Sequence, residues 1–268
     1  MDDIQKVSFD LLQTFIYVCD KLKLDWFLVN GSALGAVKYN GFIPWDDDID
    51  VALKRKDYEI FLENAQKILP DHIFLQNYRT EKDFPKIFSK LRNSNTSFIE
   101  KSVERLNINH GIYIDIFCLD NFPDDSTEQV KFKRKNKLLL WKTMCALDDR
   151  SKLKIRVRNA VFRALGYHKR TSESFAKLEK LISGFEESSL ICNHGDRMGA
   201  KQVMPKEIYG KGSKAMFEGI EVKVPEKIDE YLTYKYGDWR SDPPEEAQNS
   251  HHKTVICDPS RSYKEYVK

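Results

Sequence analysis

The sequence has no apolar run long enough to cross a membrane, which takes about 18 residues or more. It begins with Met1-Asp2-Asp3, an acidic start that lacks the basic residues and apolar stretch of a secretory signal. The five cysteines form no Cys-x-x-Cys pair and lie far apart, at Cys19, Cys118, Cys145, Cys192 and Cys257. The sequence therefore predicts neither a disulfide framework nor a compact zinc site. These absences favour a protein of the reducing cytoplasm.

A strong net charge is also missing, because 44 Lys and Arg stand against 41 Asp and Glu, for a net charge of +3. So small an excess gives no reason to expect a nucleic-acid partner. Hydrophobic residues make up 41% of the 268 positions and aromatic residues 12%, which excludes a disordered or fibrous chain. A chain of this length fits one large domain, or one domain with a substantial insertion.

The charge is spread unevenly along the chain. Residues 131–170 contain fourteen Lys or Arg and two Asp, so their local charge is +12 and the rest of the chain sums to −9. Leu153, Val157, Val161 and Leu165 interleave with the basic residues at the spacing of one helical face. Such a helix suits peripheral contact with the anionic inner face of a membrane. The alternative is a helix packed on the core with a basic solvent face, and no aromatic-basic motif favours nucleic acid.

Apolar periodicity predicts helices and strands that are mixed along the chain, with the strands clustered. We expect helices at 4–24, 33–38, 57–68 and within 126–183, and strands at 26–29, 48–53, 73–78, 86–91, 96–99, 112–117 and around 215–224. This pattern predicts an α+β fold more than a regular βαβ repeat. We divide the chain into a core over 1–125, a basic helical segment over 126–190, and a C-terminal part over 191–268 that completes the active site.

Three carboxylates alternate along one short segment, at Asp46, Asp48 and Asp50. In an extended chain they would share one face, because residues two apart point the same way. Two like charges about 4 Å apart repel by about 4 kcal/mol at an effective dielectric of 20, so such a cluster favours a bound cation. Hard oxygen ligands suit Mg²⁺ or Mn²⁺. The alternative is an Asp-rich solvated loop after Pro44.

A fourth carboxylate, Asp115, lies between apolar neighbours in a segment that predicts a buried strand. A buried Asp is unfavourable unless it is paired or binds metal, so Asp115 is expected to join Asp48 and Asp50. The alternative to metal binding is a local hydrogen bond of the Asp115 carboxylate.

Gly31 and Ser32 follow a predicted strand and open a helix, where backbone N–H groups can hold phosphate.

These segments together resemble a known family. Residues 31–38, Gly-Ser-Ala-Leu-Gly-Ala-Val-Lys, and 41–50, Gly-Phe-Ile-Pro-Trp-Asp-Asp-Asp-Ile-Asp, are similar to the signature of the LicD/fukutin-like phosphotransferases. Residues 111–117, Gly-Ile-Tyr-Ile-Asp-Ile-Phe, resemble the later acidic strand of that family, and residues 236–252 resemble its C-terminal block. The resemblance implies a nucleotidyltransferase-like mixed-sheet core with a helical insertion.

The resemblance also implies a reaction, the transfer of phosphocholine from CDP-choline to a sugar of a cell-surface glycopolymer precursor of the teichoic acid or lipopolysaccharide type. Mg²⁺ or Mn²⁺ would bind Asp48, Asp50 and Asp115, and would neutralise charge on the donor diphosphate. Asp46 would be a further metal ligand or the base that accepts the acceptor proton. The acceptor would be a glycan or a lipid-linked glycan, and no nucleic acid is implied.

Several positions would contact the donor: Gly31, Ser32, Lys38, Lys90, Arg92, His251 and His252. Lys90 and Arg92 could equally lie on a solvated strand face, and paired histidines near a terminus are often structural or exposed. A choline head group binds aromatic faces. Tyr39, Trp45, Tyr113 and Trp239 lie in or near the motif segments, but they suit core packing equally well.

Three rival functions are compatible with the same residues. A related enzyme would transfer ribitol phosphate or a sugar phosphate from a nucleotide donor. A nucleotidyltransferase would transfer NMP and release pyrophosphate. A binding module without turnover would dock on an anionic polymer or a membrane and use its Asp-rich loop only to hold a cation.

Overall fold

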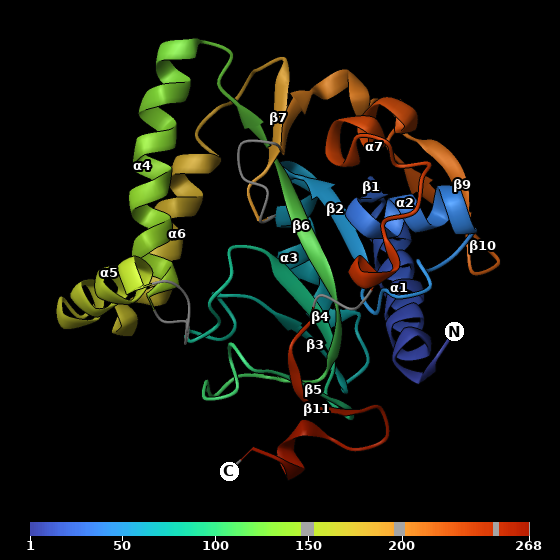
Figure 1. The fold of residues 1–268 in the computed structure, drawn as a ribbon, viewed down its shortest axis with the longest axis horizontal. Helices are drawn as coiled ribbons and strands as arrows, with labels where there is room; N and C mark the ends of the chain where they lie inside the picture. The colour runs from blue at the N-terminus through green and yellow to red at the C-terminus, as the bar shows by residue number, and fades with distance from the viewer. Residues whose placement is uncertain (146–152, 196–201, 249–251, 268) are drawn as a thin grey trace.

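A computed structural model describes residues 1–145, 153–195, 202–248 and 252–267 of the chain (Figure 1). The described α-helices are α1 (Asp3–Leu22), α2 (Asn30–Tyr39), α3 (Arg55–Asn64), α4 (Ser126–Met144), α5 (Leu153–Ala164), α6 (Thr171–Ile182) and α7 (Ile228–Tyr236). The strands are β1 (Trp26–Leu28), β2 (Asp50–Lys54), β3 (Ile73–Gln76), β4 (Ser89–Asn93), β5 (Ser97–Glu100), β6 (Ile112–Phe122), β7 (Leu190–Asn193), β8 (Val203–Pro205), β9 (Ser213–Phe217), β10 (Ile220–Val224) and β11 (Thr254–Asp258).

The main sheet has seven strands, and β6 lies at its centre. The order β1-β2-β6-β4-β3 is joined by β7, which pairs with the last four residues of β6, and by β8 beyond it. Only β2 and β6 run parallel among the described pairs, and all the others are antiparallel. Helices and strands mixed in this way make an α+β fold, as predicted from the sequence, and they are consistent with a nucleotidyltransferase-like core.

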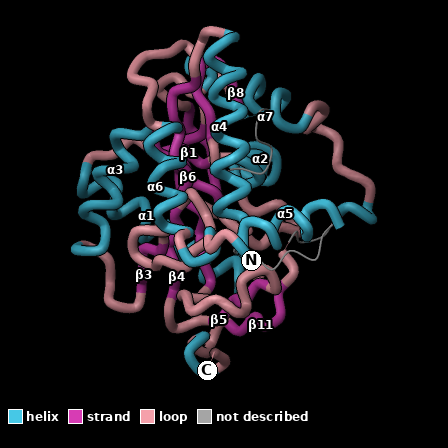
Figure 2. The backbone as a smooth tube through the Cα atoms, turned by 90° about the vertical axis from the view of Figure 1, so that its left-hand side faces the viewer, coloured by secondary structure: helices cyan, strands magenta, loops and turns pink. Residues whose placement is uncertain are grey.

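Successive side chains of β6 point to opposite faces of the sheet. Ile114 and Ile116 are fully buried in the main core, together with Phe15 of α1 and Phe61 of α3. The rings of these two phenylalanines lie 5.3 Å apart, so α1 and α3 cover the same face of the sheet (Figure 2). Asp115 lies between the two isoleucines and therefore points to the opposite face, where the candidate site is built.

The helical segment that follows β6 packs through a smaller core of its own. Phe132 of α4 and Phe175 and Leu178 of α6 are buried there. Ion pairs tie this part to the sheet, because Arg55 of α3 contacts Asp120 of β6 at 2.7 Å and Glu179 of α6 at 3.0 Å. The predicted helical insertion is thus present and is anchored beside the central strand.

The C-terminal part returns to the rest of the chain at several points. Strand β7 joins the main sheet, and β11 pairs antiparallel with β5. The predicted helices and strands of the first 125 residues occur close to their expected places, with β6 continuing to Phe122. Helix α7 and strand β11 occupy stretches for which the sequence predicted no element.

None of the helices within the described residues is both long and apolar enough to cross a bilayer. All five cysteines are free thiols, four of them buried and Cys257 exposed, so none forms a disulfide.

Candidate functional site

The carboxylates of Asp48, Asp50 and Asp115 converge from two neighbouring strands. The parallel pairing of β2 with β6 places Asp50 opposite Asp115, and the Asp115 N–H donates to the Ile49 carbonyl at 2.8 Å. One oxygen from each carboxylate lies within 4.8 Å of the others. The structure therefore brings together the three residues expected to bind metal.

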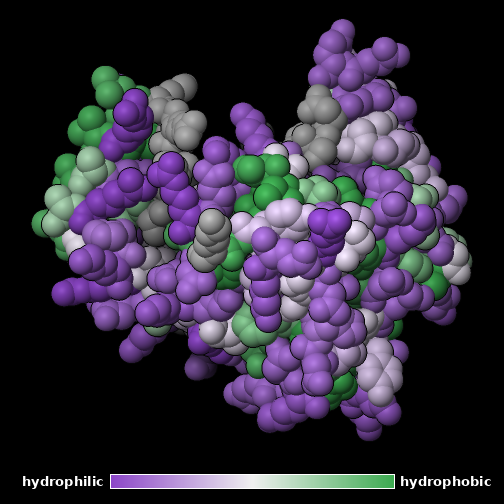
Figure 3. Space-filling view, turned by 90° about the horizontal axis from the view of Figure 1, so that it is seen from below, coloured by the Kyte–Doolittle hydropathy of each residue, from purple (hydrophilic) through white to green (hydrophobic). Residues whose placement is uncertain are grey.

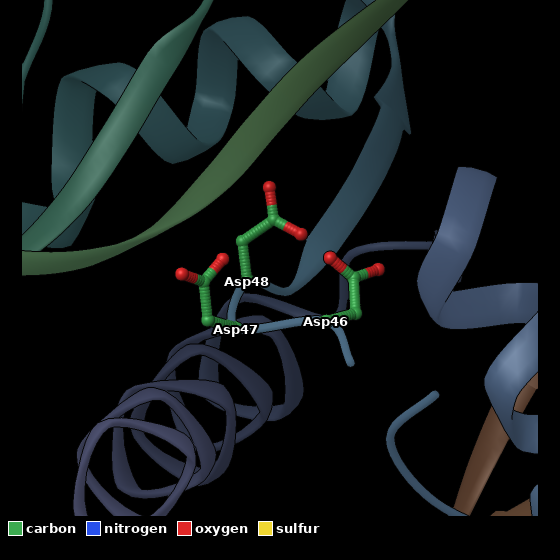
Figure 4. A group of neighbouring side chains, drawn as sticks. All are labelled: Asp46, Asp47 and Asp48. Carbon is green, nitrogen blue, oxygen red and sulfur yellow. The ribbon is translucent and has the colours of Figure 1, made fainter. Parts of the chain in front are cut away.

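A second group of carboxylates comes from the loop before β2. Oxygens of Asp46, Asp47 and Asp48 also lie within 4.8 Å of one another, and the three side chains project from one side of the segment (Figure 4). The predicted strand over 48–53 begins only at Asp50, so the loop does not alternate as an extended chain would. Asp47, which was not among the predicted site residues, is therefore part of the cluster.

Burial and mutual repulsion oppose ionisation of this cluster. Both effects raise the pKa of Asp48 and of Asp50 well above the ordinary aspartate value. Burial, then the charge of Asp50, raises the pKa of Asp46 to about 6. A divalent cation would favour the ionised forms, and these oxygen donors are of the kind that Mg²⁺ and Mn²⁺ prefer. The residues thus fit a hard divalent ion.

Basic side chains border the cluster on the side of β4. Lys90 is 3% exposed and forms an ion pair with Asp115 at 2.7 Å, since the two residues are paired in register. Its ammonium also lies 3.1 Å from the centroid of the Tyr113 ring, and burial lowers its pKa. The Lys90 ammonium therefore offsets negative charge of the cluster directly. Lys90 and its neighbours do not form a solvated strand face.

Arg92 lies two residues further along β4, with its guanidinium 1% exposed. It donates to the side-chain oxygen of Gln76 and to the carbonyl of Gly111. These hydrogen bonds give Arg92 a structural role in the sheet. Its predicted contact with the donor stays a prediction.

His252 reaches the cluster from the segment before β11. Its Nδ1 lies 2.8 Å from Asp47, and its Nε2 lies 3.6 Å from Asp48. Burial alone would lower its pKa, but the bond to Asp47 and the charge of Asp48 raise it to about 9. The two carboxylates thus favour the protonated form of this imidazole. The other predicted histidine, His251, lies outside the described residues.

The start of α2 lies against the same carboxylates. Gly31 and Ser32 belong to the first turn of this helix, whose amide groups have no partner within the helix. A Cβ added at Gly31 would lie 2.8 Å from an oxygen of Asp46. The Ser32 hydroxyl accepts a 2.8 Å bond from the Asp50 N–H. Both residues therefore adjoin the cluster, and their predicted phosphate contact stays a prediction.

Lys38 lies at the opposite end of α2, seven residues or about 10 Å from Gly31 along the axis. Its ammonium pairs with Asp242 at 2.6 Å, and Tyr39 also donates to Asp242. The structure therefore links Lys38 to the C-terminal segment, and its predicted phosphate contact stays a prediction.

Helix α7 supplies contacts that sequence reasoning missed. Asn30 adopts a left-handed backbone with φ of 52°, its N–H donates to the Tyr231 hydroxyl at 3.0 Å, and its side chain accepts from the Lys235 ammonium. Asn30 and Lys235 both favour the ionised form of Asp50, whose pKa burial and Asp48 raise. An Asn-Gly pair tolerates a left-handed residue, but nothing in the sequence pointed to α7 as its partner.

The aromatic residues considered for choline binding lie in different environments in the structure. Tyr113 is buried and covered by Lys90 and therefore has no face for a ligand. Tyr39 and Trp45 are half-buried and meet edge to face with ring centroids 6.2 Å apart. Trp45 directly precedes Asp46, so this pair offers one aromatic surface near the cluster.

Fold and site together define a protein of the nucleotidyltransferase-like class with an acidic cluster at its centre. Residues 23–135 match the family described as LicD/FKTN/FKRP, nucleotidyltransferase domain, a range that contains all the clustered aspartates. The chain is also 26% identical over 260 residues to the lipopolysaccharide cholinephosphotransferase LicD of Haemophilus influenzae, covering 92% of this chain and 94% of that protein. Residues 23–135 thus match a LicD-type domain, as the motifs of the chain predicted.

Proposed function

We propose that this transferase moves phosphocholine from CDP-choline to a sugar of a cell-surface glycopolymer precursor, with Mg²⁺ or Mn²⁺ bound at its aspartates. The observation that carries the proposal is the convergence of Asp48, Asp50 and Asp115 beside the start of α2. The similarity to a lipopolysaccharide cholinephosphotransferase supports choline as the head group and a lipopolysaccharide-type acceptor over a teichoic acid.

Asp48, Asp50 and Asp115 would hold the metal ion. When bound, the ion supplies positive charge that stabilises the donor diphosphate and the leaving nucleotide. Lys90 and His252 then keep the surrounding carboxylates in place through their ion pairs with Asp115 and Asp47. They act as positioning residues for the metal ligands.

The amide groups of Gly31 and Ser32 would bind a donor phosphate, because the start of a helix carries unpaired N–H groups and a partial positive charge. In the transfer, the acceptor hydroxyl oxygen attacks the choline-bearing phosphorus. The bond from that phosphorus to the bridging oxygen breaks, and CMP leaves with that oxygen.

Asp46 is the group best suited to accept the proton of the acceptor hydroxyl. It lies beside the proposed metal ligands, and burial raises its pKa above the ordinary aspartate value, which favours proton uptake. The Tyr39–Trp45 pair offers the quaternary ammonium an aromatic surface next to that base.

The test is product analysis with several donors. The protein is incubated with Mg²⁺, lipopolysaccharide or teichoic acid precursors, and CDP-choline, CDP-ribitol, UDP-sugars or ATP. The proposal expects CMP and phosphocholine-modified acceptor from CDP-choline, abolished in Asp48→Asn and retained in Asp10→Asn, an exposed aspartate of α1. Pyrophosphate release from ATP would identify a nucleotidyltransferase, and transfer from CDP-ribitol alone would identify a ribitol-phosphate transferase.

A further inference from the structure

Helix α5 turns an apolar stripe toward solvent. Leu153, Val157, Val161 and Leu165 recur every four residues, and their exposed fractions are 73%, 56%, 54% and 64%. Asn159 lies on the opposite face of this helix and is 4% exposed. The aliphatic face therefore points away from the side on which α5 packs, and the sequence-based alternative of a helix with its apolar face on the core is wrong.

The position of α5 is set by contacts with α4. The guanidinium of Arg163 donates to the Cys145 carbonyl at 2.6 Å, and that of Arg158 lies 5.4 Å from the centroid of the Trp141 ring. Seen from below, hydrophobic residues gather at the left edge of the molecule, where Figure 1 places α5 (Figure 3). The stripe is thus held outward by the packing of its own helix.

Basic residues flank the stripe. Residues 153–170 contain six Lys or Arg and no Asp or Glu. At about 100° per residue, Lys154 lies on one side of the stripe and Arg156 on the other, and both are exposed. An outward apolar face between two basic edges is the arrangement of a helix that lies in a membrane interface.

A hollow between α4 and α6 has similar chemistry. It has a volume of about 440 Å³ and is lined by Lys135, Leu138, Leu139, Lys177, Lys180 and Leu181. Aliphatic side chains with ammonium groups around them thus occur on the two helices next to α5 in the chain.

We propose that the exposed face of α5 docks on the surface of an anionic lipid bilayer. The aliphatic stripe would enter the boundary between head groups and acyl chains, and Lys154 and Arg156 would lie at the level of the lipid phosphates. A second copy of this chain fits less well, because two α5 faces would bring their positive charges together. Docking would hold the transferase where a lipid-linked acceptor lies.

Vesicle sedimentation with the full chain, without donor or acceptor, tests the docking separately from the reaction. Vesicles of phosphatidylglycerol and phosphatidylcholine are compared with phosphatidylcholine alone. We expect binding only to the anionic vesicles, weaker at 0.5 M salt than at 0.1 M salt because salt screens the charges. No binding to anionic vesicles, or equal binding to both kinds, would overturn the proposal.

Two double variants separate the apolar and the charged contributions. Val157→Ser with Val161→Ser should weaken vesicle binding at least about tenfold. Lys154→Gln with Arg156→Gln should weaken it about 25-fold, because each basic residue near the surface contributes about fivefold. The matched control, Val130→Ser with Met216→Ser, changes two exposed hydrophobic residues on α4 and β9 and should bind like the wild type.

All three variants should keep the wild-type unfolding temperature and the wild-type rate of CMP release with a soluble acceptor. Unchanged vesicle binding by the serine pair would refute the assignment. So would a concentration-dependent dimer that the same pair abolishes, because that face would then belong to a second copy of the chain.

Discussion

Replacement of Asp48 by Asn should stabilise the metal-free protein while it abolishes the reaction. Asp48 belongs to both carboxylate groups, and its neighbours Asp46, Asp50 and Asp115 carry the same charge within 4.8 Å. At that distance and an effective dielectric of 20, one pair of like charges repels by about 3.5 kcal/mol. His252 offsets one such pair, and the carboxyl can also relieve repulsion by binding a proton.

The net gain in the free energy of unfolding is therefore expected to be smaller, about 1–2 kcal/mol, which raises Tm by about 2–8 °C for a domain of this size. Thermal unfolding is measured in EDTA and again with saturating Mg²⁺ or Mn²⁺. The wild type should gain about 2.7 kcal/mol at a metal concentration of 100 times Kd, and Asp48→Asn should gain little.

Asp10→Asn is the matched control, because Asp10 is exposed on α1 and should affect neither measurement. A lower Tm of Asp48→Asn in EDTA, together with the full metal-induced rise, would refute the predicted repulsion. That result would mean that the ionised carboxylate of Asp48 stabilises the fold through its contacts.

Three further predictions concern other parts of the site and the fold. Gly31→Ala places a methyl group 2.8 Å from an Asp46 oxygen, so kcat should fall at least about tenfold without loss of folding, and unchanged kcat would contradict the contact. Trp45→Ala should raise KM for CDP-choline by about 2- to 30-fold and leave KM for CDP-ribitol unchanged, and equal effects on both donors would exclude a choline contact. Burial lowers the pKa of His194 to about 4, so its neutral form stabilises the fold above pH 6.5 and that contribution is lost as pH falls toward 4. The free energy of unfolding of His194→Phe should therefore fall less steeply between pH 6.5 and 4 than that of the wild type, and parallel curves would refute this.

The acidic strand was predictable because its signal is local. Asp115 lies between Ile114 and Ile116, and such a pattern predicts a buried strand with one carboxylate on the opposite face. The structure places that carboxylate beside Asp48 and Asp50 through the pairing of β2 with β6. Local periodicity also predicted most of the helices and strands in the first half of the chain.

Residues that act through distant contacts were not predictable in the same way. Lys235 meets Asn30 across 205 positions, and the pairing of β4 with β6 sets Lys90 against Asp115. The sequence alone does not reveal which distant residues face each other in the fold. For α5 the spacing of the apolar residues was evident, but only packing determines whether that face is covered or exposed.

Mn²⁺ titration of the metal-stripped protein tests whether aspartates from β2, its preceding loop and β6 hold a divalent ion. The ion is followed by electron paramagnetic resonance in wild type, Asp115→Asn and Asp10→Asn. We expect tight binding by the wild type and the Asp10 variant, and at least about tenfold weaker binding once Asp115 loses its charge. Equal affinity in all three proteins would contradict this prediction.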